Sequence, residues 1–407
     1  MISEVDLSDC FRYCIFSQPP PSALRNFVSS FAAEPTMEAM SCYGDVMGQS
    51  ELRHVLLQRH KCAPKTDIVV TAGGNQAMAN VSLAVLDPGD AAILIAPYYF
   101  SHKAAIDLAG AEAIVTGFEE GSFQPDVSAV TGALEAANGR AKMVVLTSPN
   151  NPSGVVTEPD RLAALAATCR AHNAWLVLDE AYADITYSSE SDAPPAAAAA
   201  AAAAVGSDAP QLEYEEGIIR LFTFSKNFGM AGWRLGYALY PNALSEAMLK
   251  VQDTLCTHAT LASQSLGLEA LKATATDSSR RGAGDGEEDG SAGEDSAWLA
   301  AQVNALHKPR EVLWRAVQHT GCVKGQGAYF FCPPLPPAWR RDPATETMAF
   351  DVLANDFKVL VTPGLAFGVP GHFRCSYGSL PDETLAEGAD RLHKGLVHLA
   401  STTPPGN

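Results

Sequence analysis

Apolar runs of strand length recur between residues 68 and 240, and most of them are separated by segments with helical periodicity. Most of these runs are continuously apolar, which is typical of strands buried on both faces by helices. The pattern predicts a three-layer α/β sandwich around a seven-stranded, mostly parallel sheet. Its strands are expected at 68–71, 91–96, 113–116, 143–147, 175–178, 218–224 and 233–240.

The pattern changes after residue 262, where the apolar runs become shorter. This predicts a smaller α+β domain over 263–407, following a large domain over 43–262. An N-terminal segment, 1–42, is expected to pack with the small domain. The expected elements of the small domain are strands at 328–332, 359–362 and 372–376, and helices at 263–274, 298–319 and 382–399.

Two low-complexity stretches interrupt the pattern, one at 188–216 and one at 273–297. The first contains nine consecutive alanines and is expected to be a surface insertion, whereas the second is rich in Gly, Asp, Glu and Ser and is expected to be a disordered loop. Together they carry more than half of the formal net charge of -18. The negative balance argues against a nucleic-acid partner that is bound through its phosphates.

The sequence offers no candidate for a membrane span, because the alanine tract is too weakly hydrophobic to cross a bilayer. The nine cysteines form no C-x-x-C pair and mostly have apolar neighbours, which indicates buried, reduced thiols. Residues 1–10 carry three acids and no basic residue, unlike a secretory signal. These features predict a cytoplasmic protein without a membrane partner.

The candidate chemistry centres on the stretch 221–237, in which Lys226 follows an apolar run. A lysine at the end of a strand is most often a surface charge. Here, however, Thr223, Ser225 and Arg234 could together hold a phosphate beside the amine. This combination suits a Schiff-base lysine that anchors pyridoxal phosphate.

A glycine pair, Gly73 and Gly74, precedes an expected helix at 76–86. Exposed backbone amides and the positive end of a helix make such a turn a phosphate cradle, although a glycine pair often only permits a tight turn. Because Lys226 lies in the same domain, we expect these glycines and Asn75 to form the second half of a phosphate site.

Three further polar residues lie at or beside apolar runs. Asp179 ends the run at 175–178, where a buried carboxylate needs a cation; the alternative is a helix N-cap. Asn151 lies in the loop 148–154 after another strand, where open α/β sheets bind ligands, although an ordinary turn is the alternative. Arg374 lies on an expected short strand, and its guanidinium suits a bidentate grip on a carboxylate.

These motifs resemble those of the fold type I, class I and II aminotransferases. The pattern Ser-Lys-x-x-x-x-x-Gly-x-Arg occupies 225–234, Asn-Pro-Ser-Gly occupies 151–154, and Asp-x-x-Tyr occupies 179–182. The resemblance runs from about residue 18 to the C-terminus, outside the two low-complexity stretches. It implies a dependence on pyridoxal 5′-phosphate, with Lys226 joined to the cofactor as a Schiff base.

The resemblance also implies a role for each matching residue. Lys226, Asp179 and Tyr182 would be catalytic: the lysine moves the α-proton of the substrate, the carboxylate keeps the ring nitrogen of the cofactor protonated, and the tyrosine contacts its 3-oxygen. Arg374, with Asn151, would bind the α-carboxylate of the substrate. The other expected cofactor ligands are Gly73, Gly74, Asn75, Tyr99 (stacked on the ring), Asn151, Thr223, Ser225 and Arg234, and Tyr43 from a neighbouring subunit.

Within the family, the chain looks most like the plant-type aromatic aminotransferases, on the motifs Tyr-Gly-Asp-x-x-Gly at 43–48 and Pro-Tyr-Tyr-Phe at 97–100. This implies a homodimer that passes an amino group from an aromatic L-amino acid or methionine to a 2-oxo acid in a ping-pong reaction. The alternatives are a carbon–sulfur lyase on the same fold and a non-catalytic cofactor-binding module. The N-terminal arm is shorter than is usual in the family, and Tyr13 or a neighbour stands where a glycine that closes over the substrate is expected.

Overall fold

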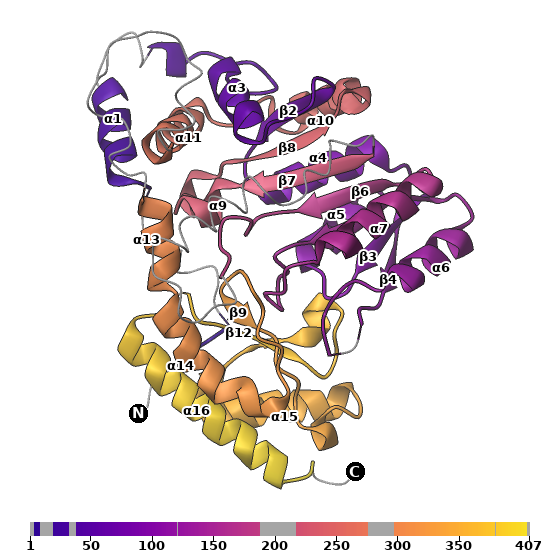
Figure 1. Ribbon diagram of the computed structural model, residues 1–407, viewed down its shortest axis with the longest axis vertical. Coiled ribbons are helices and arrows are strands. Elements are labelled where there is room, and N and C mark those ends of the chain that lie inside the picture. The colour runs from indigo at the N-terminus through magenta and orange to yellow at the C-terminus, as the bar shows by residue number, and fades with distance from the viewer. Residues whose placement is uncertain are drawn as a thin grey trace.

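The computed structural model describes residues 4–8, 19–31, 38–119, 121–187, 217–275, 297–378 and 380–404. A large domain built on a seven-stranded sheet lies above a smaller domain of helices and short strands, and the labels used below are those of Figure 1. The surface insertion expected at 188–216, most of the loop expected at 273–297, and Tyr13 lie outside the described residues.

The central sheet has the strand order β2-β8-β7-β6-β5-β3-β4. Neighbouring strands from β4 to β7 pair in parallel, whereas β8 is antiparallel to both β2 and β7. The predicted seven-stranded, mostly parallel sheet is therefore confirmed. Its strands are β2 Thr66–Thr71, β3 Ala91–Ile95, β4 Glu112–Thr116, β5 Ala141–Thr147, β6 Trp175–Asp179, β7 Ile218–Thr223 and β8 Gly236–Pro241.

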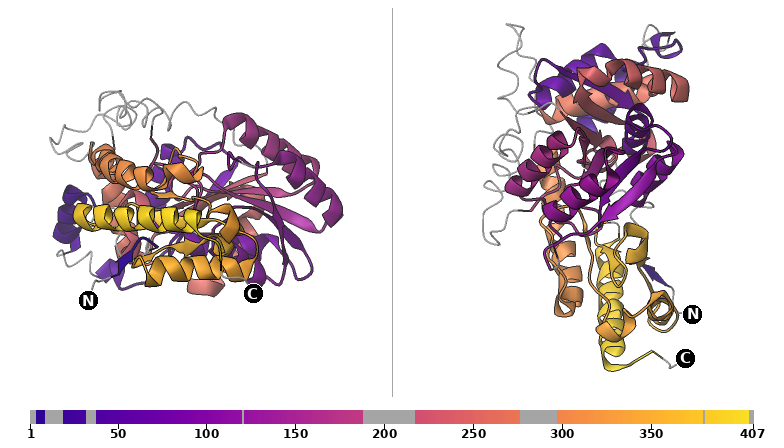
Figure 2. Two further views of the ribbon diagram at one scale, coloured as in Figure 1. Left: turned by 90° about the horizontal axis from the view of Figure 1, so that it is seen from below. Right: turned by 90° about the vertical axis from the view of Figure 1, so that its right-hand side faces the viewer.

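Helices cover both faces of this sheet (Figure 2). They are α3 Ser50–Arg59, α4 Gly74–Val85, α5 Phe100–Leu108, α6 Val127–Ala137, α7 Pro159–Ala171, α10 Ser245–Cys256 and α11 Leu261–Thr274. Because alternate residues of a strand point to opposite faces, Leu94 of β3 belongs to the core under α4, α5 and α10, whereas Ile93 belongs to the core under α6 and α7. A third core joins β2, β7 and β8 to α3 and α11.

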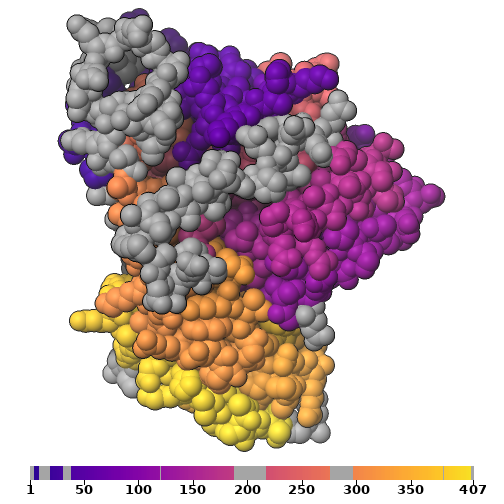
Figure 3. Space-filling model, viewed as in Figure 1, coloured from indigo at the N-terminus to yellow at the C-terminus, as the bar shows by residue number. Residues whose placement is uncertain are grey.

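The smaller domain packs its helices around a three-stranded antiparallel sheet of order β11-β12-β9. In the space-filling view this domain, coloured orange to yellow, lies directly against the large domain (Figure 3). Its elements are α13 Trp298–Ala305, α14 His307–Val317, β9 Phe330–Phe331, α15 Pro343–Asn355, β10 Val359–Leu360, β11 Thr362–Pro363, β12 Phe373–Ser376 and α16 Asp382–Ser401.

The single helix expected at 298–319 is two helices, α13 and α14, that meet at Leu306. Pro309 gives the physical reason, because its ring nitrogen carries no hydrogen to donate to the carbonyl of Ala305. At the start of α13, Trp298 packs against the core of the small domain and the third core of the large domain. This helix therefore connects the two domains.

The described N-terminal residues contact both domains. β1, Val5–Asp6, pairs in parallel with β10, and Leu7 is buried in the core of the small domain. α1, Pro21–Phe31, lies against α11, and its Phe27 is part of the third core. α11, which the sequence analysis assigns to the small domain, contributes Leu266 to that same large-domain core.

His60, which follows the last residue of α3, contacts two neighbouring strands of the sheet. Its ring lies 4.3 Å from the ring of Phe222, and its Nε2 is 2.7 Å from the hydroxyl of Tyr237. Burial, and then the charges of Arg220 and Arg59, hold the pKa of His60 well below its usual value of 6.5. The folded protein therefore keeps this imidazole neutral at pH values where the unfolded chain binds a proton.

We expect the free energy of unfolding to fall as the pH drops below 6.5, the usual pKa of the imidazole. Above that pH the ring is neutral in both states, whereas below it the unfolded state alone gains the proton. One such group contributes a slope of up to about 1.4 kcal/mol per pH unit. Urea unfolding across this pH range should therefore show a shallower slope for His60→Gln, which cannot take up the proton; equal slopes would contradict this assignment.

Candidate functional site

Lys226 lies on a four-residue helix, α9 (Phe224–Asn227), and not at the end of a strand as the sequence analysis predicts. β7 stops at Thr223, whose hydroxyl caps the helix by accepting a hydrogen bond from the amide of Ser225 at 3.1 Å. Lys226 itself is half-buried, and its Nζ lies 5.9 Å from the centre of the ring of Tyr329. Because Tyr329 belongs to the small domain, the amine lies at the junction of the two domains.

Gly73 and Gly74 form the turn from β2 into α4, at whose first residue Gly74 stands. This turn lies against the Lys226 segment, since a Cβ on Gly74 would lie 3.7 Å from the Cβ of Thr223. A Cβ on Gly236, at the start of β8, would lie 2.7 Å from the carbonyl carbon of Gly73 and 2.8 Å from the nitrogen of Gly74. Glycine at 236 therefore permits β8 to approach the N-terminus of α4 closely.

Arg234 adds a positive charge to this glycine turn. The strand expected at 233–240 begins only at Gly236, because residues 231–233 form a 3-10 turn and Arg234 has a left-handed backbone (φ 51°, ψ 64°). The Nη2 of Arg234 donates a hydrogen bond to the carbonyl of Ala72 at 3.1 Å. A Cβ on Gly73 would lie only 2.5 Å from this Nη2. The left-handed turn thus brings the guanidinium to the glycine turn.

These segments together form a candidate anion site. The N-terminal amides of α4 carry the positive end of the helix dipole, and Arg234 carries a full charge. The hydroxyls of Thr223 and Ser225 lie on the neighbouring segment, and both residues are buried. Asn75, in the first turn of α4, is exposed. The arrangement suits a phosphate group.

Asp179 ends β6, and its carboxylate contacts a histidine that the sequence analysis does not predict. Oδ2 lies 2.9 Å from Nε2 of His102, and Oδ1 accepts from the amide of Ala181 at 3.1 Å. The second bond is the local contact expected of a cap, yet residues 181–184 form a turn and not a helix. His102 is 3% exposed, and its Nδ1 has no hydrogen-bond partner among the described residues. The carboxylate is thus fixed from two sides and keeps acceptor capacity for a cationic ligand.

Tyr99 lies next to this histidine. It immediately precedes α5, and its ring meets the ring of His102 edge to face with the centres 5.5 Å apart. The spacing of three residues at the start of a helix places the two side chains together. That spacing is the sequence signal that could have identified His102 as a partner of the predicted site.

Asn151 and Arg374 meet across the two domains. Arg374 lies on β12, and its Nη1 donates to Oδ1 of Asn151 at 3.1 Å, while its Nη2 donates to the carbonyl of Ser8 at 2.9 Å. The rings of Phe330 and Phe367 lie 5.3 and 5.1 Å from the centre of the guanidinium. The side chains of Asn151 and Arg374 are therefore held in a fixed relation, and both residues are buried.

Arg374 is 2% exposed, yet within the described part of the chain its guanidinium hydrogen-bonds neutral oxygens. Its Nε has no hydrogen-bond partner among those residues. Burying a positive charge without a carboxylate is costly. A ligand carboxylate would complete this environment, which is what the sequence predicts for Arg374.

Tyr182 and Tyr43, the two other predicted tyrosines, lie in contrasting surroundings. Tyr182 is buried, and its ring centre is 5.5 Å from that of Tyr329, the same ring that faces the Lys226 amine. Tyr43 is 88% exposed, and its ring meets the edge of His258. Within one chain, the structure therefore places Tyr182 and the Lys226 amine beside the same ring, that of Tyr329, and leaves Tyr43 at the surface.

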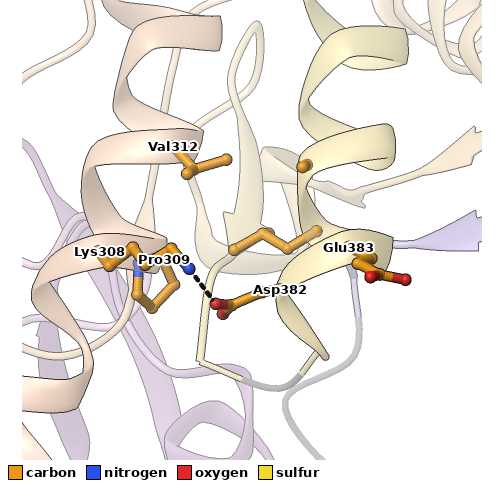
Figure 4. Close-up of a pocket in the computed structure, with 7 residues that line it drawn as sticks. Lys308, Pro309, Val312, Asp382 and Glu383 are labelled. Atoms are coloured by element: carbon orange, nitrogen blue, oxygen red, sulfur yellow. Dashed lines mark hydrogen bonds and ion pairs between the residues drawn. The ribbon is translucent and has the colours of Figure 1, made fainter.

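The described residues include neither of two other kinds of feature, a membrane-spanning helix or a metal cluster. No described helix is long and apolar enough to cross a membrane, and the described residues contain no cluster of three or more metal-ligating side chains. A pocket of about 250 Å³ between α14 and α16 is lined by residues such as Lys308, Val312 and Asp382 and contains none of the predicted site residues (Figure 4).

A family model described as aminotransferase class I and II matches residues 17–392. The chain belongs to the class I and II aminotransferases. This aminotransferase is 30% identical over 395 residues to an aromatic aminotransferase of Arabidopsis thaliana. The aligned residues make up 94% of this chain and 88% of the relative. It is 31% identical over 367 residues to a probable aspartate/prephenate aminotransferase of Thermus aquaticus, and the alignment spans 88% of this chain and 82% of that relative.

Solved structures agree with this assignment. The aminotransferase superposes with a TM-score of 0.75 on an aspartate aminotransferase of Thermus thermophilus with maleate, at 28% identity and with 97% and 92% of the two chains covered. An aspartate aminotransferase of Thermotoga maritima gives a TM-score of 0.76 at 25% identity, with 97% and 92% covered. The chain is therefore a pyridoxal-phosphate-dependent transaminase, which moves an amino group between an amino acid and a 2-oxo acid.

The residues of this aminotransferase fit the cofactor. The glycine turn and Arg234 suit a phosphate, because the absence of a Cβ at Gly73 lets the guanidinium lie directly against the turn. The carboxylate of Asp179 suits a cationic ring nitrogen, because it is nearly buried and a buried carboxylate needs a cationic partner. Arg374 suits the carboxylate that amino acids and 2-oxo acids share.

Proposed function

We propose that Lys226 bonds covalently to the cofactor at the carboxyl end of the central sheet. The observation that supports this most is the meeting of the glycine turn, Arg234 and the Thr223–Lys226 segment, because the anion site then adjoins the segment that carries a half-buried amine. The other proposed contacts are Gly73, Gly74, Asn75, Thr223 and Ser225 with the phosphate, Asp179 with the ring nitrogen, Tyr99 with the ring face, and Asn151 and Tyr182 with the 3-oxygen.

The proposed reaction assigns a physical task to each group of the chain. When bound, the cofactor supplies an electron-accepting ring beside the reacting carbon. Arg374 orients the substrate through its α-carboxylate, so that the α-proton faces Lys226. Lys226, released when the substrate amine takes its place on the cofactor, would remove that proton and return it to the cofactor carbon that receives the amino group. Asp179 holds the proton on the ring nitrogen and thereby favours the electron flow into the ring. In a ping-pong sequence, a 2-oxo acid then takes up the amino group.

Aromatic amino acids or methionine are the donors that we propose. The rings of Phe330 and Phe367 flank the Arg374 guanidinium, and the ring of Phe100 lies 6.0 Å from that of Phe367 and is partly exposed. Such rings favour an apolar or aromatic side chain in the substrate. Lys103, three residues after Phe100, is engaged with Asp107 at 2.8 and 3.0 Å and is not free to bind a second carboxylate. The Arabidopsis relative, which is named an aromatic aminotransferase, supports the same donors.

Aspartate or prephenate is a second candidate, favoured by the names of the Thermus relatives. A donor with a second carboxylate needs a cation opposite its side chain. The described hydrogen-bond and ring contacts of Arg374 are all aromatic or neutral, so we expect that a second cation would come from a neighbouring subunit. We therefore rank these donors below the aromatic ones.

Assays of the purified protein with pyridoxal phosphate and phenylpyruvate or 2-oxoglutarate should separate the candidates. We expect kcat/KM for phenylalanine, tyrosine or methionine to exceed that for aspartate at least about tenfold, since apolar contacts discriminate by that order. A preference for aspartate would support the second candidate. Pyruvate and ammonia released without a 2-oxo acid would indicate a carbon–sulfur lyase, and bound cofactor without any product would indicate a non-catalytic module.

A homodimer with shared sites is proposed from the surface of the large domain. Tyr43 is 88% exposed, and the nearby α10 exposes Leu249 and Leu255 by 43% and 48%. Covering these side chains with a second copy would remove apolar surface from water and could bring Tyr43 to the phosphate of the other subunit.

The seven described cysteines are free thiols, which supports the predicted cytoplasmic location.

A further inference from the structure

The helix that carries Lys226 is too short to hold itself in place. α9 has four residues, and a single helical turn is unstable in isolation because its nucleation is not repaid by further hydrogen bonds. Its direction must therefore be fixed by contacts at its two ends. At the N-terminal end, the Thr223 hydroxyl supplies the cap, and Phe224 is buried in the third core of the large domain.

The C-terminal end is held by a side-chain hydrogen bond. Asn227, directly after Lys226, is 5% exposed, and its Nδ2 donates to Oδ2 of Asp184 at 2.7 Å. Asp184 lies in the turn that follows β6, five residues after Asp179. The loop that follows Asp179 thus contacts Asn227, the residue next to Lys226.

The same carboxylate contacts a cation from a third segment. Nη2 of Arg59, the last residue of α3, donates to both oxygens of Asp184 at 3.2 and 3.3 Å. The guanidinium of Arg59 also lies 6.0 Å from the ring centre of Phe228, the residue after α9. Arg59 therefore neutralises the charge of Asp184 and also lies near Phe228, the residue that follows Asn227.

We propose that Asp184 is a positioning residue for Lys226. Held by Arg59, its carboxylate fixes Asn227 and so sets the orientation of the short helix that presents the amine. This inference rests on the proposed function, because it assigns the effect to the amine that would bond to the cofactor. It adds Arg59, Asp184 and Asn227 to the site as residues that act through Lys226 without contacting substrate.

A merely structural role would give a different result. About a third of the Arg59 side chain is exposed, and an exposed ion pair contributes roughly 0–1 kcal/mol to stability. If that were its whole role, breaking the contact would affect folding slightly and the reaction not at all. A positioning role instead predicts an effect on kcat, because a small misplacement of a reacting group is costly in rate.

The test uses a reciprocal exchange of side chains. Asn227→Asp places two carboxylates against each other and breaks the hydrogen bond. The double variant Asp184→Asn/Asn227→Asp restores a donor opposite an acceptor with their positions exchanged. Glu112→Gln is the matched control, because it breaks the exposed pair with Arg140 on the edge strand β4.

We expect Asn227→Asp to lower kcat about 10- to 100-fold with little change in KM, and the double variant to recover most of that loss. In the cofactor-free protein, the rate at which acetic anhydride modifies Lys226, followed by peptide mass spectrometry, should change in Asn227→Asp and return in the double variant. Glu112→Gln should match the wild type in both measurements. Unchanged kcat and labelling in Asn227→Asp, or a loss that the double variant does not recover, would overturn the proposal.

A separate measurement distinguishes failure of this inference from failure of the proposed function. Wild-type protein loaded with pyridoxal phosphate is treated with borohydride, and the cofactor mass is located by peptide mapping. If the mass is not on Lys226, the proposed function fails and this inference fails with it. If the mass is on Lys226 while the exchange variants behave like the wild type, the inference about Asp184 alone is wrong.

Discussion

The Lys226→Ala variant is expected to lose transamination activity at least about 10⁴-fold. In the proposed reaction the amine both bonds to the cofactor and moves the α-proton, and removal of a general base alone costs up to about four orders of magnitude. The fold should persist, because Lys226 is half-buried and the core residues around it are Phe224 and Phe228. Steady-state assays with phenylpyruvate, together with the absorbance of the bound cofactor, measure both parts of the effect.

The control for this variant is Lys103→Ala, which removes an exposed lysine that pairs with Asp107 on α5. It should leave kcat and the cofactor spectrum unchanged. Sustained turnover by Lys226→Ala at a rate close to that of the wild type would refute the assignment of the amine. So would a cofactor spectrum identical to that of the wild type.

The second large effect is expected for Asp179→Ala, with a loss in kcat of about 10²- to 10³-fold. The proposed cause is the lost carboxylate opposite the ring nitrogen. The loss in folding stability should be smaller, about 1–3 kcal/mol, because the substitution leaves Nε2 of His102 without its partner in a buried place. Measured in the same variant, kcat and the free energy of unfolding give the two effects separately.

Asp179→Asn sharpens this comparison. The amide keeps the size of the side chain and can still accept from the amide of Ala181, so that mainly the negative charge is lost. We expect its kcat to fall nearly as far as that of Asp179→Ala, with less effect on stability. Asp160→Asn, in the first turn of α7, is the matched control and should resemble the wild type. A normal rate in both Asp179 variants would remove this carboxylate from the mechanism.

The hydrophobic pattern was sufficient to predict the sheet because its central strands, such as β3 and β5, are buried on both faces. Continuous apolar runs such as 91–96 and 143–147 have few alternatives in a chain of this length. The strand expected at 233–240 is the informative exception. Trp233 and Arg234 fall within this expected strand, but Trp233 ends a 3-10 turn and Arg234 has a left-handed backbone. Local composition does not encode that turn, because it is set by the approach of Gly236 to the glycine turn.

The predicted site residues that the structure brings together, such as Asn151 with Arg374, lie at recognisable motifs. His102 and Asp184 have no such motif. Each owes its place to a contact between segments that are distant in sequence, His102 with Asp179 and Asp184 with Arg59 and Asn227. A charged or polar residue on a loop or a helix start has many possible partners, and only the folded chain selects one.

The register of the central sheet has a consequence for how this chain can vary in evolution. Thr147 pairs with Asp179, and Asp179 pairs with Leu221, so that β5 and β6 end level and β7 runs two residues further, to Thr223. Backbone hydrogen bonds at the fixed spacing of neighbouring strands, about 4.8 Å, therefore set the separation of these chain ends. Residues 188–216 fall between β6 and β7 in the sequence, and the ladder between the two strands does not depend on how many residues join them. Such a scaffold can gain or lose long connecting segments across lineages while its reactive groups keep their mutual distances.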